Sequence, residues 1–402
     1  MFKTPHPFTA LLVSLFITGT SSGGVWTQKA NVPGLGRADG TGAATTGKGY
    51  IGTGYTTGYT VDWYEYNPGS NTWTMKSNFG GSPNVESSCF AISGYVYLLP
   101  GPNNTDFWRY DPVLNSWTQM TAFPGGGRQA AVSFVINGLG YITTGASATL
   151  GSSIDDLWEY DPVANSWLQK ANLPGVARHY AAGFSIGGKG YVGTGYSAVT
   201  GTNLNDVWAW DQATNTWAQM ASLPGPARNE GTAFSIGNYG FMGGGYTPNP
   251  DSSFYKYDPV SNTWSSIAAF GGGGRVECVS FSIGSSGYLG TGWDGTLFRN
   301  DFWEYAEGDP VGLNETTGLL SQNDYKLFPN PVTVNTTLQF NEEVNVAGAA
   351  YHVLDINGKE LMKGALTGHR TSMSRGDLTA GLYILEVIRD GKRMLRTNFV
   401  IE

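Results

Sequence analysis

Arginines recur at one position of this sequence, and their spacing is the first pattern that suggests chemistry. Tryptophans recur at intervals of 44 to 50 residues, and eleven residues after each stands Arg37, Asn84, Arg128, Arg178, Arg228 or Arg275. A guanidinium group binds a carboxylate through two parallel hydrogen bonds. If the repeat brings these side chains together, they can bind an acidic sugar or a peptide carboxylate, or form structural ion pairs.

Acidic residues recur two positions further along the chain. They are Asp39, Glu86, Glu230 and Glu277, and the other two repeats have Ala130 and Tyr180 there. Two interpretations remain open: ion pairs between arginines and these acids that order the structure, or a polar pocket for a ligand. For the pocket we expect ligand contacts from the five arginines together with Glu86, Tyr180 and Trp293.

Candidates for acid–base catalysis are weaker. Glu230 or Glu277 could exchange a proton with a sugar while Arg228 or Arg275 holds the carboxylate of that substrate. His179 could act as a general base only with a positioned partner, and a histidine with ordinary hydrogen bonds is the simpler interpretation.

Metal and disulfide chemistry find little support in the sequence. Cys89 and Cys278 lie in repeats that are not adjacent, where other repeats have Gly, Ala or Ser, so we predict small buried side chains and no disulfide. We also predict no metal and no cofactor, because no cluster of metal ligands is present.

Composition indicates the type of scaffold that carries these residues. Among 402 residues there are 58 glycines, charged residues make up 13%, and hydrophobic residues make up 40%. This composition suits tight turns and strands better than helices, where glycine is costly. The net charge is −8 and no basic face is apparent, so we predict no nucleic-acid partner.

The tryptophans mark six units of one repeat. They are Trp26, Trp73, Trp117, Trp167, Trp217 and Trp264, and in the five complete units an Asn stands two residues earlier. Most units also have an Asp eleven residues before the Trp, with Ser253 as the exception. Alternating residues and turn residues predict four short strands in each unit.

These landmarks resemble kelch repeats, each of which forms one blade of a β-propeller, as in galactose oxidase. The resemblance covers residues 25–308 and implies a six-bladed propeller. The last unit lacks its fourth-strand Trp while "WTQKA" at Trp26 stands alone, so we expect the N-terminal segment to complete that blade. Copper chemistry like that of galactose oxidase is rejected, since the propeller contains a single histidine, His179.

In strings such as "DLWEYDPVANSW" at 156–167, we interpret the aromatic residues as core between blades and "DPVAN" as a turn. A row of sugar-stacking platforms is the alternative. The propeller topology places all the variable loops on one face, beside the arginines. Loop aromatics there could stack on sugars or pack on neighbouring loops: Tyr55, Tyr59, Tyr196, Tyr246, Trp293 and Phe298.

The two ends of the chain predict export. Residues 1–24 contain Lys3, a short apolar run and then small residues, which is typical of a secretory signal peptide and too short for a transmembrane anchor. A Gly/Thr/Asn-rich linker over 309–324 is followed by alternating strands with turns at Asn357-Gly358 and Asp390-Gly391, which predict a small, Ig-like β-sandwich over 325–402.

The tail resembles the C-terminal sorting domain of the type IX secretion system of Bacteroidetes. The resemblance rests on "FPNP" at 328–331, the turn at 357–359, Leu378 and "GLY" at 381–383. It implies recognition by the outer-membrane translocon and delivery to the cell surface or the medium; an accessory adhesion sandwich is the alternative.

The sequence therefore predicts an all-β protein, with a six-bladed propeller and a C-terminal β-sandwich, that binds a glycan or a protein outside the cell. The alternative activity is that of a non-redox sugar epimerase or mutarotase, and bacterial sialic-acid epimerases are kelch propellers too. A fold alone implies no reaction.

Overall fold

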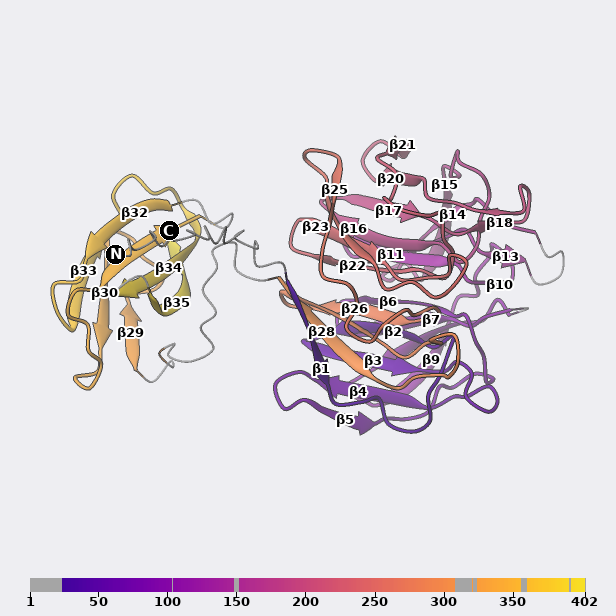
Figure 1. Ribbon diagram of the computed structural model, residues 1–402, viewed down its shortest axis with the longest axis horizontal. Helices are drawn as coiled ribbons and strands as arrows, with labels where there is room; N and C mark the ends of the chain where they lie inside the picture. Colours follow the sequence, from indigo (N-terminus) through magenta and orange to yellow (C-terminus); the bar gives the residue numbers. More distant parts are fainter. Residues whose placement is uncertain are drawn as a thin grey trace, which may run out of the picture. The chain divides into compact units, whose positions relative to one another are not determined.

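Every regular element of the described residues is a β-strand, and strands form two compact units that divide between Pro310 and Val311. The computed structural model describes residues 24–102, 104–147, 152–307, 320, 324–355, 360–389 and 392–401. Each unit is described by itself (Figure 1). The predicted signal peptide, most of the linker and the turns at 357–358 and 390–391 lie outside these residues.

The first unit contains six four-stranded antiparallel sheets, the predicted blades. Within each blade the first strand is innermost and the fourth is outermost, and the chain visits the blades in order. The blades are: blade 1, β2 (Thr41–Thr45), β3 (Lys48–Gly52), β4 (Trp63–Asn67), β5 (Thr72–Met75); blade 2, β6 (Ser88–Ile92), β7 (Tyr95–Leu99), β8 (Phe107–Asp111), β9 (Ser116–Met120); blade 3, β11 (Val132–Ile136), β12 (Leu139–Thr143), β14 (Leu157–Asp161), β15 (Ser166–Lys170); blade 4, β16 (Ala182–Ile186), β17 (Lys189–Gly193), β20 (Val207–Asp211), β21 (Thr216–Met220); blade 5, β22 (Thr232–Ile236), β23 (Tyr239–Gly243), β24 (Phe254–Asp258), β25 (Thr263–Ser266); blade 6, β26 (Val279–Ile283), β27 (Ser286–Gly290), β28 (Phe302–Ala306) and β1 (Val25–Lys29).

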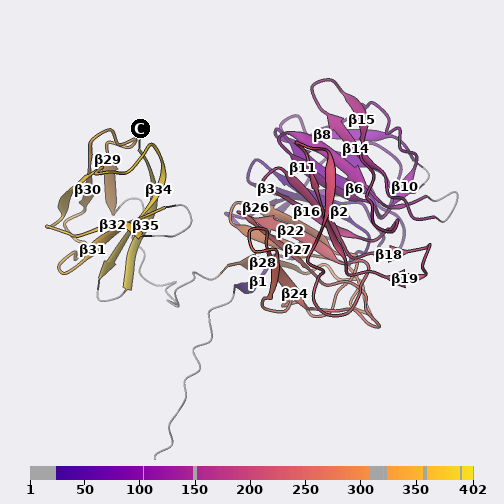
Figure 2. The same cartoon turned by 90° about the horizontal axis from the view of Figure 1, so that it is seen from above.

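Short two-stranded ribbons extend the loops of blades 3 and 4. They are β10 (Arg128–Gln129) with β13 (Ala146–Ser147), and β18 (Tyr196–Ser197) with β19 (Thr202–Asn203). The inner strands contact one another in a closed sequence, β2, β6, β11, β16, β22, β26 and again β2, which makes the unit a ring (Figure 2).

The N-terminal strand closes the ring, as predicted. β1 pairs antiparallel with β28 from Val25 opposite Ala306 to Lys29 opposite Phe302, and so becomes the outermost strand of blade 6. The Trp26 ring packs between Phe254, Phe270 and Tyr305 at centroid distances of 5.1 to 5.3 Å. Closure leaves β28 with a partner on both sides, which removes an edge that other chains could pair with.

The Asn and Trp of each repeat fasten neighbouring blades together. In blade 3 the Trp167 indole donates a hydrogen bond to the Thr121 carbonyl at 3.2 Å, and the Asn165 side-chain oxygen accepts one from the Thr121 N–H at 3.1 Å. The Asn165 oxygen also accepts the Tyr160 hydroxyl at 2.8 Å. Corresponding Asn and Trp contacts recur at Asn71 and Trp73, Asn115 and Trp117, Asn215 and Trp217, and Asn262 and Trp264. The repeated string is therefore architecture.

The aromatic residues of the third strands fill the spaces between blades. Tyr160 is fully buried, and its ring lies 4.8 Å from that of Phe107 in the preceding blade. Leu157, on the opposite face of the same strand, packs in a cluster with Val192 and Trp210 of the following blade. Both faces of a blade are thus apolar, as the alternation predicts.

The second unit is a β-sandwich. One sheet holds β29 (Tyr325–Phe328), β30 (Asn335–Phe340) and β33 (Arg370–Ser374), and the other holds β31 (Ala350–Leu354), β32 (Glu360–Ala365), β34 (Gly381–Arg389) and β35 (Lys392–Ile401). Buried residues of both sheets, including Leu338, Met373, Leu385 and Phe399, form one core cluster. This unit contains the predicted landmark Tyr383, which is buried.

Candidate functional site

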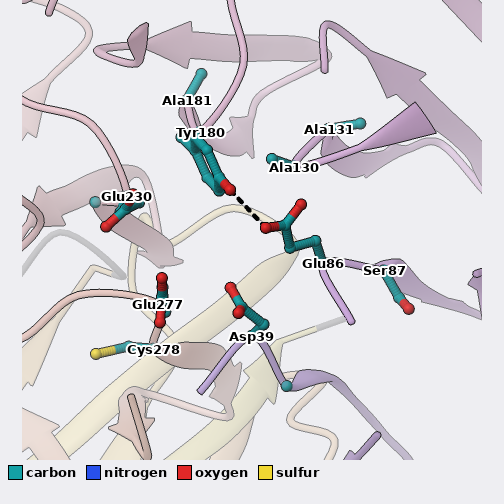
Figure 3. Close-up of a pocket in the computed structure, with 12 residues that line it drawn as sticks. Asp39, Glu86, Ser87, Ala130, Ala131, Tyr180, Ala181, Glu230, Glu277 and Cys278 are labelled. Carbon is teal, nitrogen blue, oxygen red and sulfur yellow. Dashed lines mark hydrogen bonds between the residues drawn. The ribbon is translucent and has the colours of Figure 1, made fainter. Parts of the chain in front are cut away.

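Six structurally equivalent residues surround one end of the central channel. They are Asp39, Glu86, Ala130, Tyr180, Glu230 and Glu277, and each stands two residues before the first residue of the inner strand of its blade. Figure 3 shows the four carboxylates and the Tyr180 ring converging on the channel. We call this group the mouth. It lines a cavity of about 110 Å³.

The backbone of the mouth is unusual, and it aims these side chains. All six residues have φ between 52° and 57°, in the left-handed region that residues other than glycine rarely adopt. Their peptide groups are hydrogen-bonded in series: Glu86 N–H to Asp39 C=O, Ala130 to Glu86, Tyr180 to Ala130 and Glu230 to Tyr180, at 2.9 to 3.2 Å. The strained conformation is therefore held by bonds between blades.

The mouth gathers negative charge without a basic residue in its lining. Burial, and then the neighbouring carboxylates Glu277 and Glu86, raise the pKa of Asp39 to about 8. Burial and the other carboxylates raise the pKa of Glu230 and of Glu277 to about 7. Burial also raises the pKa of Glu86, and a hydrogen bond of 2.5 Å from the Tyr180 hydroxyl partly opposes that rise.

These values make the mouth an acceptor of protons, hydroxyl groups or cations. Near neutral pH the carboxyl groups share protons, because four negative charges in one partly buried site repel one another. The second oxygen of Glu86, Oε2, is buried and has no hydrogen-bond partner among the described residues. A ligand that donates hydrogen bonds or carries positive charge would relieve both features.

The predicted arginine ring at the mouth is wrong. The side chains of Arg37, Arg128, Arg178, Arg228 and Arg275 are 0 to 2% exposed, and none of them lines the cavity. They do not pair with the acids two residues later either. Each binds an Asp that precedes the third strand of its own blade, as Arg178 Nη1 and Nη2 bind Asp206 at 2.7 and 2.8 Å. The five carboxylate partners are Asp62, Asp156, Asp206, Asp251 and Asp301.

The left-handed backbone of the mouth residue explains why the arginine two positions earlier does not reach the channel. Side chains two positions apart share a face only on an extended strand, and a residue with φ near +53° reverses the direction of the chain between positions such as 178 and 180. The arginine thus points into its blade while the mouth residue points into the channel. In blade 5 the partner is Asp251, two residues earlier than the repeat suggests, and Ser253 adds a contact to Arg228 at 3.1 Å.

Each buried arginine also holds the turn at the end of the second strand, which reads "GTG" in blades 1, 4 and 6, "TTG" in blade 3 and "GGG" in blade 5. Arg178 Nη1 donates to the carbonyl of Thr194 at 3.1 Å, and Thr194 itself has a φ of 62°. Blade 2 has neither the arginine nor the turn residue with positive φ. Asn84 replaces the arginine, and Pro100, whose ring forbids positive φ, stands at the turn position. The arginines are therefore scaffold residues.

Of the remaining predicted site residues, Glu86, Tyr180, Glu230 and Glu277 lie in the mouth, whereas His179 and Trp293 lie outside its lining. The Nδ1 atom of His179 is 2.9 Å from the Ser153 hydroxyl, and burial lowers the pKa of this histidine. Among the residues that the structure describes, no carboxylate accepts a hydrogen bond from His179 to position it as a base.

Four of the loop aromatics named from the sequence form a crescent around the mouth. In blades 4, 5, 6 and 1, the residue before the mouth position forms an antiparallel backbone bridge with an aromatic residue: Tyr196, Tyr246, Trp293 and Tyr55. Blade 3 has Ala146 there. The sequence does carry a signal for this crescent, since each aromatic directly follows the second glycine of a Gly-x-Gly turn.

Below the mouth the channel continues past the inner strands. Its next section, about 190 Å³, is lined by small and hydroxyl side chains such as Ser88, Ser133 and Ser280, and also by Cys89 and Cys278. Both cysteines are free, as predicted, and burial raises the pKa of their thiols. Within the described ranges, no group of three or more His, Cys, Asp or Glu side chains is arranged to hold a metal ion.

Comparisons with known proteins support this architecture. Residues 177–224 and 240–271 match the Kelch motif, and residues 326–402 match the secretion system C-terminal sorting domain. A solved structure titled "Structure of YjhT" is similar, with a TM-score of 0.60 and 19% identity, over 68% of this chain and 95% of that one. A search of curated proteins found no match.

The sorting domain indicates secretion or attachment at the cell surface through the type IX system. In the part of the chain that the structure describes, no helix has the length and apolar character needed to cross a membrane. Taken together, the closed ring of six blades, the motif matches and the sandwich make this chain a kelch-type β-propeller with a C-terminal secretion sorting domain.

Proposed function

We propose that this secreted protein is a binding module that holds a glycan or a protein at the mouth and on the loops around it. The observation that carries the proposal is a cavity with four convergent carboxylates, Asp39, Glu86, Glu230 and Glu277, inside a crescent of four aromatic residues. Polar groups in a hollow fix the orientation of a ligand, and aromatic rims supply contact area.

Because carboxyl groups and no arginines line the mouth, fewer classes of ligand fit it than the sequence suggested. With the arginines buried in ion pairs, an acidic sugar or a peptide carboxylate would meet carboxyl groups there and no cation. A neutral glycan, whose hydroxyl groups donate hydrogen bonds to carboxylates, or a cationic segment of a protein fits better. The same burial leaves the epimerase alternative without the arginine that was to hold its substrate.

The mouth can be tested with two ligand screens on the chain 25–402, a glycan array and a display library of random peptides. We expect selective binding that a Glu230→Gln/Glu277→Gln variant weakens about tenfold or more, since removing charge-assisted hydrogen bonds from a buried site costs at least that. A Glu342→Gln/Glu343→Gln variant, changed at two exposed tail positions, serves as the control. Equal binding by the mouth variant would place the site elsewhere, and no binding in either screen would count against the proposal.

The tail completes the proposed route: export by an N-terminal signal peptide, then recognition of residues 325–402 by the type IX translocon. Deleting 325–402 is expected to leave a folded propeller inside the cell envelope, because the blades and the sandwich have separate cores. Protease accessibility of a tagged chain on intact cells measures this, with the tagged full chain as control. Surface delivery of the shortened chain would contradict the proposed role of the tail.

A further inference from the structure

We propose that the ligand is a polypeptide segment that places an arginine or lysine side chain in the mouth and apolar side chains on a patch where blades 6 and 1 meet. This inference rests on the proposed function and names its ligand class. We define the seam patch as Leu35, Tyr55, Tyr59, Leu297 and Phe298, on the face that carries the loops between second and third strands.

The seam patch has three aromatic rings in contact at its centre. The Tyr55 ring lies 5.9 Å from that of Tyr59 and 5.7 Å from that of Phe298. Between 37 and 61% of each of the five side chains is exposed to solvent. Gly36, the residue after Leu35, lies against the Phe298 carbonyl, where any larger side chain would overlap it, so the two chain segments run close together there. Apolar patches on soluble proteins mark interaction sites.

The seam patch continues into the mouth at two points. Tyr55 exchanges two backbone hydrogen bonds with Ala38, at 2.8 and 3.0 Å, and Ala38 directly precedes Asp39. Phe298 is bridged to Trp293, which exchanges two bonds of 3.0 Å with Val276, the residue before Glu277. One ligand can therefore reach the patch and the carboxylates together.

Charge complementarity selects the occupant of the mouth. Four carboxyl groups line it and no Lys, Arg or His does. On the patch side, the only described cation of the blade 6 loop, Arg299, is already paired with Asp294. A guanidinium group can bind two carboxylate oxygens at once, and its flat face packs on aromatic rings, so arginine suits this combination best.

The make-up of the seam patch favours a polypeptide over a glycan. Its three rings meet edge to face, at interplanar angles of 75° and 79°, so they present no common flat platform for sugar rings. Two of its five members are leucines, which pack against apolar side chains and do not stack on sugars. Apolar and aromatic cores beside an arginine anchor are typical of protein interfaces.

A peptide selection on the chain 25–402 tests this inference. Random 12-residue peptides are selected by mRNA display, and the enriched sequences are measured by fluorescence anisotropy. We expect Arg or Lys next to Leu, Phe, Tyr or Trp, and a loss of about tenfold or more when that Arg or Lys becomes Gln. Two variants, Tyr59→Ser/Phe298→Ser and Glu230→Gln/Glu277→Gln, should each weaken binding by a similar factor.

The control is Val163→Ser/Val260→Ser, which changes two side chains that are 95% exposed in the turns between third and fourth strands, away from the mouth. It should bind like the unchanged protein. Selected peptides without a basic residue, or binding that survives the seam variant, would overturn the inference. Glycan binding at the mouth with no peptide selected would refute the inference and leave the proposed function standing, whereas failure of both ligand types would refute both.

Discussion

Removing strand β1 is expected to abolish the stable propeller. Without residues 25–30, β28 loses its five paired partners and the blade 5 and 6 core loses Trp26, which is 8% exposed. Replacing a buried tryptophan with alanine alone costs about 3–5 kcal/mol. We therefore expect Trp26→Ala to lower the melting temperature by on the order of 10 °C, and the deletion to lower it further.

The measurement is thermal unfolding followed by circular dichroism. Val25→Ala is the matched control, because Val25 belongs to the same strand but its side chain is 61% exposed. Its melting temperature should stay close to that of the unchanged protein. If the deletion variant melted at the same temperature as the unchanged protein, closure by β1 would contribute nothing to stability.

Breaking one buried arginine–aspartate pair should have the second largest effect. Arg178→Met leaves the Asp206 carboxylate without its two bonds of 2.7 and 2.8 Å and frees the Thr194 carbonyl. Removing one partner of a buried pair costs about 3–5 kcal/mol. The double variant Arg178→Met/Asp206→Asn should recover part of that loss, since no charge then remains unpaired.

The pH dependence of this effect has a definite sign. Burial raises the pKa of Asp206, but the hydrogen bond and the charge of Arg178 outweigh burial and lower it overall. A lowered pKa in the folded state adds stability above the unfolded value and loses it as the pH falls through the folded value. The difference between the unchanged protein and Arg178→Met should thus shrink below about pH 4.

Chemical unfolding at several pH values measures both expectations. Arg299→Met is the control: its pair with Asp294 is on the surface, and such pairs contribute about 1 kcal/mol or less. A loss for Arg178→Met no larger than that of the control would mean that the buried pairs are dispensable.

The repeat made the scaffold predictable. The orphan "WTQKA" and the missing last Trp indicated closure by β1 because an open ring would leave unpaired strand edges, and the alternation indicated that aromatic residues such as Tyr160 pack between blades. Such features depend on period and strand pairing, which the spacing of residues records.

The site was predictable only in part. The mouth acids were identified, but the buried arginines were assigned to the same surface because an extended backbone was assumed from 178 to 180, and Tyr180 has a φ of 53°. Backbone reversals at residues other than glycine leave little trace in a single sequence. Asp251 was missed because it stands two residues earlier, relative to the Trp, than the Asp of the other repeats.

The series of hydrogen bonds between mouth residues has a consequence for evolution and for design. Backbone hydrogen bonds join five of the six left-handed positions, from Asp39 to Glu230, so that link between blades does not depend on which side chain each position carries. Carboxylate, alanine and tyrosine already occupy equivalent places. Ligand selectivity can therefore change by exchanging the side chains at these positions, while the propeller that displays them stays the same.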